Sequence, residues 1–494
     1  MSHSSQSPNG NGTSDVKTTD ETTPLLAASV TTPILGAAEA EQIQQSEVNK
    51  NDQIPTLQVF VLSYASLVEP VAFFSIFPYI NAMIEKVGGV EKEDVGFYSG
   101  LIESLFSATQ MCVMVLWGKA SDRYGRKPIL VISLFGIAFT TALFGLSTAI
   151  WQMILFRCLA GVFAGTVVTV RTMLSENSSP KTQATVFSRF AFARNIGILI
   201  GPVIGGALER PAEKFPSLFG RIQFFKEYPY AFPSFISALV GLTAAISAAI
   251  IIKETLDVQA LKDASKNRMS IFDLIKYPGV RQVLLVYNYV MLLAITFTTI
   301  FPVFMYTPIP LGGLSLTPGW IAMFMSLGGL SQSLWILLVF PRLHKRIGTE
   351  GILTFSATIW PIFFILHPTC NLFLRYDLKA LFWTVFPVNN AVGCGCAMSF
   401  AAVQLAINDI APSPETFGTL NSIALALASG LRAVAPALST SLYATGVKYH
   451  ILGGHMFWVI LVAIALGLPF FIRMLPEKTR RKVMKSDDEQ EEQA

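Results

Sequence analysis

GKASDRYGRK, residues 118–127, decides the fold because it lies between two long apolar runs. Its charged side chains cannot stay in hydrocarbon, so we expect the chain to leave the membrane here, turn sharply at Gly118 and Gly125, and re-enter at Pro128. The excess of Lys and Arg in the stretch indicates the cytoplasmic side. The stretch therefore predicts a cationic cytoplasmic turn between two membrane helices.

The composition independently predicts a membrane protein. Of 494 residues, 52% are hydrophobic and only 14% are charged, which leaves too little polar surface for a soluble protein. The Lys and Arg residues lie mainly in short loops and the tail, without a basic stripe, so the expected partner is the lipid bilayer and not nucleic acid. The five cysteines lie almost wholly in apolar segments, and five histidines without a His-rich loop predict no metal site and no cofactor.

Twelve apolar runs of about twenty residues predict an all-α membrane protein with twelve transmembrane helices in two pseudo-symmetric halves. The first six runs are residues 57–84, 97–117, 128–149, 151–173, 184–208 and 230–252. The second six are residues 280–306, 318–340, 350–367, 379–402, 416–443 and 451–474. The predicted layout is a disordered cytosolic arm (1–55), a first half (56–252), a polar cytoplasmic connector without an apolar run (253–279), a second half (280–475) and a charged cytosolic tail (476–494).

The stretch Arg342–Gly348 lies in the second half where residues 118–127 lie in the first. An internal repeat of six helices requires a turn at both places, and we interpret the second as a degenerate copy. The topology places both termini and the connector in the cytoplasm.

The pattern G-x-x-x-D-R-x-G-R-K resembles the signature loop of the major facilitator superfamily, which joins the second and third helices of a twelve-helix transporter. The resemblance implies a cytoplasmic gate, in which Asp122 neutralises a helix N-terminus near Pro414–Phe417 and Arg123 or Arg126 pairs with Glu176. The predicted gating residues are Gly118, Asp122, Arg123, Gly125, Arg126 and Glu176.

Glu69 lies about twelve residues into the first run, near the membrane midplane at 1.5 Å per residue, and Pro70 follows it. An ionisable group at that depth is costly unless it faces a cavity or a partner. One interpretation is a carboxylate that carries a proton during transport. The other is a structural carboxylate paired permanently with an arginine.

Arg157 lies in the fourth run, with Gly161 and Gly165 spaced for close helix packing. The segment resembles the R-x-x-x-G segment of the superfamily, whose arginine is tied to proton coupling, and Glu103 in the second run is a candidate partner. A helix-packing seam with an arginine near the outer interface is the alternative.

The fifth run contains Gly197, Gly201, Pro202, Gly205 and Gly206, which combine a small-residue face with a proline kink. The pattern resembles the G-x-x-x-G-P-x-x-G-G motif of antiporter branches of the superfamily. We expect it to permit tight packing against the opposite half. A generic glycine-rich packing face is the alternative.

Arg194, Asn195 and Arg432 are predicted near mid-depth and are substrate-binding candidates, because an arginine facing a cavity can hold a carboxylate or phosphate. Either arginine could instead be the permanent partner of Glu69.

Four further segments, Glu69–Ile80, Arg171–Glu176, Tyr228–Pro233 and His367–Asn371, resemble fungal and plant zinc-induced-facilitator-like transporters of the drug:proton antiporter side of the superfamily. The resemblance implies transport of metal chelators or other small solutes, into vacuoles or out of cells. Thr166 stands where this branch is expected to carry asparagine, and Arg194 stands where it is expected to carry an aromatic residue.

Glu21, Leu25 and Leu26 in the arm resemble an acidic dileucine sorting signal read by adaptor complexes, which favours a vacuolar or endolysosomal membrane over the plasma membrane. Together these observations predict a monomeric transporter, not an enzyme, that exports a small organic solute in exchange for protons by alternating access. A non-transporting sensor and a proton-independent facilitator are the alternatives.

Overall fold

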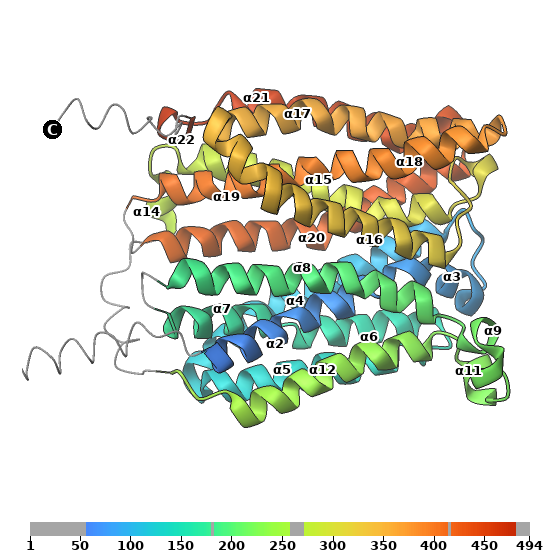
Figure 1. Ribbon diagram of the computed structural model, residues 1–494, viewed down its shortest axis with the longest axis horizontal. Coiled ribbons are helices and arrows are strands. Elements are labelled where there is room, and N and C mark those ends of the chain that lie inside the picture. Colours follow the sequence, from blue (N-terminus) through green and yellow to red (C-terminus); the bar gives the residue numbers. More distant parts are fainter. Residues whose placement is uncertain (1–55, 179–181, 257–270, 413–415, 481–494) are drawn as a thin grey trace, which may run out of the picture. The chain divides into compact units, whose positions relative to one another are not determined.

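The computed structural model describes residues 56–178, 182–256, 271–412 and 416–480, and helices without strands make up its regular structure there (Figure 1). Ten helices in these ranges are long and apolar enough to cross a membrane. One of the ten, Pro318–Arg375, runs through two predicted spans, and the shorter apolar helix Met456–Ile472 supplies another. All twelve predicted spans thus coincide with helices. The predicted sorting signal at Glu21, Leu25 and Leu26 lies outside the described residues.

The six spans of the first half correspond to α2 (Thr56–Phe74) with α3 (Phe77–Gly88), α4 (Val95–Tyr124), α5 (Arg126–Phe144), α6 (Ile150–Phe163) with α7 (Thr166–Glu176), α8 (Gln183–Leu208) and α12 (Ala231–Ile251). Three short helices join α8 to α12, namely α9 (Pro211–Lys214), α10 (Pro216–Phe219) and α11 (Gln223–Glu227).

The second half contains α15 (Val280–Tyr306), α16 (Pro318–Leu334), η2 (Trp335–Val339), α17 (Phe340–Arg375), α18 (Lys379–Gly393), η3 (Cys394–Ala397), α19 (Met398–Ile410), α20 (Phe417–Lys448) and α21 (Met456–Ile472). The short helices η1 (Ile309–Leu311), η5 (Ile451–Gly454) and α22 (Glu477–Arg480) complete it. The connector between the halves is not wholly polar, because it contains α14 (Ile271–Lys276), whose Leu274 is fully buried in the core of the second half.

The turn predicted at Gly118 does not form. Helix α4 continues through Gly118 to Tyr124, because a helix satisfies its own backbone and can carry polar side chains beyond the membrane. The chain turns at Gly125 alone, where φ is 104° and ψ is 154°, a backbone conformation that only glycine adopts readily. Helix α5 begins at the next residue.

Two predicted spans are broken inside the membrane. The first breaks after Phe74, four residues beyond Pro70, and the fourth breaks at Ala164 and Gly165. A break leaves carbonyl groups without helical partners, and in lipid each must be satisfied. Side chains of α4 and α5 bind the three carbonyls at the fourth-span break: Trp117 donates to Val162 (2.5 Å), Ser133 to Phe163 (2.5 Å) and Gln110 to Ala164 (3.1 Å).

The halves meet mainly through two helix pairs, α4 with α20 and α8 with α16. At the end away from Gly125, Tyr306 donates a hydrogen bond to Glu85, and Lys448 forms an ion pair with Asp94 (3.0 Å). Figure 1 shows α3, α9 and α11 at this end and α14 and α22 at the other. These contacts hold the two halves together at the end of the molecule away from Gly125.

Candidate functional site

A cavity of about 340 Å³ lies between the halves. Helices of the first half (α2, α4 and α8) form one wall, and α15 to α20 with η3 form the other. Five site residues predicted from the sequence line it, four of them charged: Glu69, Glu103, Arg194, Arg432 and Pro202. Neither Arg157 nor Asn195 is part of the lining. Because the described chain brings two carboxylates and two arginines into one apolar cavity, this is the candidate substrate site.

The Glu69 carboxylate is only 7% exposed and is held by one neighbour. Its Oε1 accepts a hydrogen bond from the Gln110 side chain (3.0 Å), and the same amide donates to the Ala164 carbonyl. Glu69 Oε2 is buried without a hydrogen-bond partner. Gln110 thus couples the carboxylate directly to the break between α6 and α7.

Glu103 lies on α4 and contacts the other half of the molecule. Its Oε1 accepts a hydrogen bond from Thr299 on α15 (3.1 Å). The contact is buried and joins α4 of the first half to α15 of the second.

Arg157 is 4% exposed and contacts aromatic rings. Its guanidinium carbon lies 4.4 Å from the ring centre of Phe106 and 5.5 Å from that of Phe73, as in cation–π contacts. The Nε and Nη2 atoms have no hydrogen-bond partner. Arg157 therefore lies behind the aromatic wall of the cavity, and the Glu103 partnership considered from the sequence is not an ion pair in this structure.

Arg194 faces the cavity from α8. Its Nη1 is buried without a partner, and its guanidinium carbon lies 5.7 Å from the ring centre of Phe190. Arg171 of α7 lies 5.6 Å from the same ring. The charges that act on Arg194 are those of Glu69, Arg171 and Arg432. Sequence reasoning did not assign a site role to Arg171, although an arginine within an apolar run was the signal available.

The glycines of the fifth span pack mainly within the first half, which corrects the expectation of packing against the opposite half. A Cβ added at Gly197, Gly201 or Gly205 would meet α2 and the residue after it, and at Gly205 it would overlap the Ser75 carbonyl. Gly206 alone of this set faces the other half, at Pro318 and Ala322 of α16. The reason is the 3.6-residue helical period, which turns Gly206 about 100° away from Gly205.

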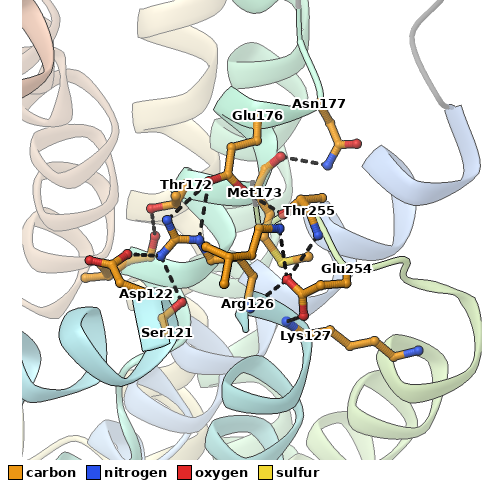
Figure 2. Close-up of polar contacts among 12 residues, drawn as sticks. Ser121, Asp122, Arg126, Lys127, Thr172, Met173, Glu176, Asn177, Glu254 and Thr255 are labelled. Carbon is orange, nitrogen blue, oxygen red and sulfur yellow. Dashed lines mark hydrogen bonds and ion pairs between the residues drawn. The ribbon is translucent and has the colours of Figure 1, made fainter. Parts of the chain in front are cut away.

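A second polar cluster surrounds Arg126, the residue that follows Gly125 (Figure 2). Arg126 is 5% exposed and forms ion pairs with Asp122 and with Glu176 Oε1 (3.2 Å), and it donates to the Ser121 hydroxyl (3.2 Å). The cluster joins α4, α5 and α7, all of the first half. We call Ser121, Asp122, Arg126, Glu176, Glu254 and Thr255 the cytoplasmic cluster.

Glu254 is a member of this cluster that sequence reasoning missed. Its carboxylate accepts four backbone N–H groups, from Arg126 (2.8 Å), Lys127 (3.1 Å), Thr255 (3.0 Å) and Leu256 (3.1 Å). The first two belong to the N-terminus of α5, where a carboxylate is favoured. Partial burial opposes ionisation, but these donors prevail and lower the pKa of Glu254 below its usual value. Thr255 extends the cluster by donating to Glu176 Oε2 (2.6 Å).

The remaining predicted gating residues have other neighbours. Asp122 contacts Arg126 of its own half, and residues 413–415 of its expected partner segment lie outside the described residues. The Arg123 guanidinium lies over the ring of Tyr124 at 5.4 Å, so Arg126 is the arginine that reaches Glu176.

In the described residues, ten long apolar helices and the shorter Met456–Ile472 supply twelve spans in two halves around a central charged cavity. This arrangement is typical of membrane transporters, which move a solute and perform no bond chemistry. The family model for the Major Facilitator Superfamily matches residues 62–413, and the chain belongs to this superfamily. It is not an enzyme.

Among its relatives is the "Efflux pump azaK" of Aspergillus niger, 41% identical over 465 residues that cover 94% of this chain and 96% of the relative. The "Protein ZINC INDUCED FACILITATOR 1" of Arabidopsis thaliana is 27% identical over 443 residues, covering 82% and 89%. The crystal structure of a D-xylose-proton symporter superposes with a TM-score of 0.67 at 11% identity, covering 87% of this chain and all of that one, which shows the shared fold.

Proposed function

We propose that this transporter exports a small organic solute from the cytosol in exchange for protons. Glu69 carries the proposal, because it is a buried carboxylate at mid-depth in the cavity wall with one oxygen atom unpartnered. Such a group is costly as an isolated charge, so it gains from holding either a proton or a ligand. The name of the A. niger relative, an efflux pump, supports the outward direction.

The contacts on either side of Glu69 support a mechanism of alternating access. A proton at Glu69 changes what Gln110 can bind, and Gln110 also holds the Ala164 carbonyl at the α6–α7 break. At the non-cytoplasmic end, Tyr306 and Lys448 hold the halves together. Opening that end requires these contacts to break while the cytoplasmic ends of the helices approach one another.

The same proposal includes the membrane in which the protein lies, its oligomeric state and the complex that sorts it. We assign the protein to a vacuolar or endolysosomal membrane as a monomer, with an adaptor complex reading the Glu21, Leu25 and Leu26 signal. The likeness to a zinc-induced facilitator supports the transporter branch. Fluorescence microscopy of the full chain and of the Leu25→Ala, Leu26→Ala double variant tests this localisation. Fluorescence at the plasma membrane should be higher for the variant.

The Glu69→Gln variant tests proton coupling in sealed vesicles with an imposed pH gradient. We expect loss of pH-driven solute flux, because glutamine cannot cycle a proton, with retention of solute counterflow. Glu91→Gln is the matched control, since Glu91 is an exposed acid outside the cavity. Wild-type pH-driven flux in Glu69→Gln would overturn the proposal.

The glycine face of α8 supplies a second test of coupled export. Gly205→Ala places a Cβ 1.8 Å from the Ser75 carbonyl oxygen, and Gly201→Leu crowds Phe74, so both should abolish coupled flux while insertion into the membrane persists. Gly118→Ala is the control, because nothing lies within 4 Å of its added Cβ. Normal uphill transport by Gly201→Leu would show that close packing at Gly201 is not needed for coupling, and the glycine face would then no longer support the antiport assignment.

A further inference from the structure

Two charged residues that line the cavity each have one side-chain atom buried without a hydrogen-bond partner, and their charges are opposite. One atom is Oε2 of Glu69 on α2, an acceptor, and the other is Nη1 of Arg194 on α8, a donor. The helices pack closely here, since a Cβ on Gly197 would lie 2.9 Å from Pro70. Both residues line the same cavity.

The two groups interact electrostatically but do not satisfy each other. Arg194 lies in the field of Glu69, yet no pair of their charged atoms comes within 4 Å in the described structure. A buried donor or acceptor without a partner costs free energy, and the cost is greater for charged groups. A ligand that supplies both a donor and an acceptor would remove both costs at once.

The rest of the cavity wall determines which shape and polarity the uncharged part of the ligand can have. Aromatic rings from both halves line it, including Phe73, Phe74, Phe106, Phe297, Phe301 and Trp360. Pairs of these rings contact each other, at 5.6 Å for Phe73 with Phe106 and 4.9 Å for Phe297 with Phe301. Ring walls of this kind favour a flat apolar body by stacking and edge contacts.

We propose that the cavity binds an aromatic zwitterion, with its ammonium group at Glu69, its carboxylate at Arg194 and its ring among the phenylalanines. Arg432 of α20 lines the cavity and can take the second carboxylate oxygen. This assignment names the solute class of the proposed function and rests on it.

An ammonium group at Glu69 is consistent with the exchange of solute for protons. A proton and an ammonium group compete for the same Glu69 oxygen, so each excludes the other, as antiport requires. A purely anionic solute would instead bind better beside a protonated Glu69. Solute and proton would then bind together, which favours cotransport. The other charges near the pair are Arg171 of α7 and Arg432, while Glu103 of α4 lines the same cavity.

Three naphthalene probes of matched size test the proposal by equilibrium binding to the full chain in lipid nanodiscs, at pH 7 without a gradient. They are 2-naphthylalanine, a zwitterion, 3-(2-naphthyl)propionate, which lacks the ammonium group, and 2-(2-naphthyl)ethylamine, which lacks the carboxylate. We expect the zwitterion to bind about tenfold or more tightly than either other probe, the effect of one charge-assisted hydrogen bond.

Two variants assign each charge to its residue. Glu69→Gln should make 2-naphthylalanine and the propionate bind alike, and Arg194→Gln should make 2-naphthylalanine and the amine bind alike. Arg342→Gln, at an exposed cytoplasmic position, should leave the ranking unchanged. If either variant fails to fold, the wild-type ranking decides alone.

Equal binding of the zwitterion and a singly charged probe, or no binding of any probe, would overturn the inference. The outcome is separable from the proposed function. A retained probe ranking without pH-driven flux would overturn only proton exchange, whereas pH-driven flux of another solute with the ranking lost would overturn only the zwitterion.

Discussion

Gly125 in the first half and Gly348 in the second occupy corresponding turns, and both have positive φ, 104° and 67°. Each turn lets one helix follow another without a long loop, and α17 accordingly consists of two helices that meet at a kink at Gly348, where φ is 67° and ψ is −174°. A glycine with positive φ therefore forms the turn between two helices in both halves.

The side chains around the two turns differ. Arg126 is buried between Asp122 and Glu176, whereas Arg342 is exposed and donates to the Leu338 carbonyl of its own helix turn (2.6 Å). Thr349, which follows Gly348 as Arg126 follows Gly125, hydrogen-bonds His344 (3.0 Å), so an internal repeat can keep a turn while the side chain beside it changes. The ion pairs of Arg126 hold α4, α5 and α7 of the first half together at this end, which fits a half that moves as a rigid unit.

The largest effect should come from removing the two arginines in turn. Arg126→Ala leaves two carboxylates facing each other without their cation, and we expect a loss of about 2 kcal/mol of stability, below the cost of breaking a fully buried pair because Asp122 is half exposed. Arg342→Ala should stay within about 0.5 kcal/mol. Thermal unfolding in detergent compares them, and equal shifts would end the contrast between the halves.

The sequence predicted the fold well because its decisive signals are local. Apolar runs of membrane length and a charged turn need no knowledge of distant contacts. One error has a local cause. Gly118 was expected to turn because glycine permits it, but a helix that leaves the membrane has no need to break there. The breaks at Ser75 and Ala164 were not predicted, since the side chains that satisfy the Ala164 break come from α4 and α5.

The candidate site was only partly predictable. Depth along a run placed Glu69 and Arg194 near one another, and both line the cavity. Depth does not fix the direction of a side chain, so Asn195, one residue from Arg194, does not line it. Glu254 was missed because its role depends on a backbone contact with α5, more than 120 residues away in sequence.

Replacing the turn glycines should cost less stability than Arg126→Ala and should distinguish the two turns at the level of the backbone. Gly125→Ala forces a side chain into a positive-φ conformation and places its Cβ 2.6 Å from Glu254 Oε2, whereas Gly348→Ala tests the positive φ in the second half. We expect a loss of about 1–2 kcal/mol for strain at each site. The loss at Gly125 should shrink in a Glu254→Ala background, and the loss at Gly348 should not. Identical responses of the two sites to that background would contradict a specific role for Glu254.

The Glu254→Gln variant removes the charge that holds the α5 N-terminus, and we expect a loss of about 1 kcal/mol. Because folding lowers the pKa of Glu254, its contribution is present above the usual carboxyl pKa near 4.5 and disappears as pH falls through the lower folded value. Wild type and variant should therefore differ in unfolding temperature at pH 7 and converge at more acid pH. A difference that persists unchanged at acid pH would assign the effect to packing and not to charge.

The smallest effect should come from Asp122→Asn, because Asp122 is the more exposed partner of Arg126 and Glu176 remains. A half-exposed ion pair contributes about 1 kcal/mol or less, enough to shift the ratio of two transporter conformations about fivefold but not to unfold either. A cysteine at Thr298, which lines the cavity, reports that ratio through its labelling rate from the cytoplasmic side in a background without the other cysteines. If Asp122 acts on the gate, Asp122→Asn should change the labelling rate while Arg342→Gln leaves it unchanged. Equal rates in all three proteins, with full transport, would show that the charge cluster serves the stability of the first half and takes no part in the cytoplasmic gate.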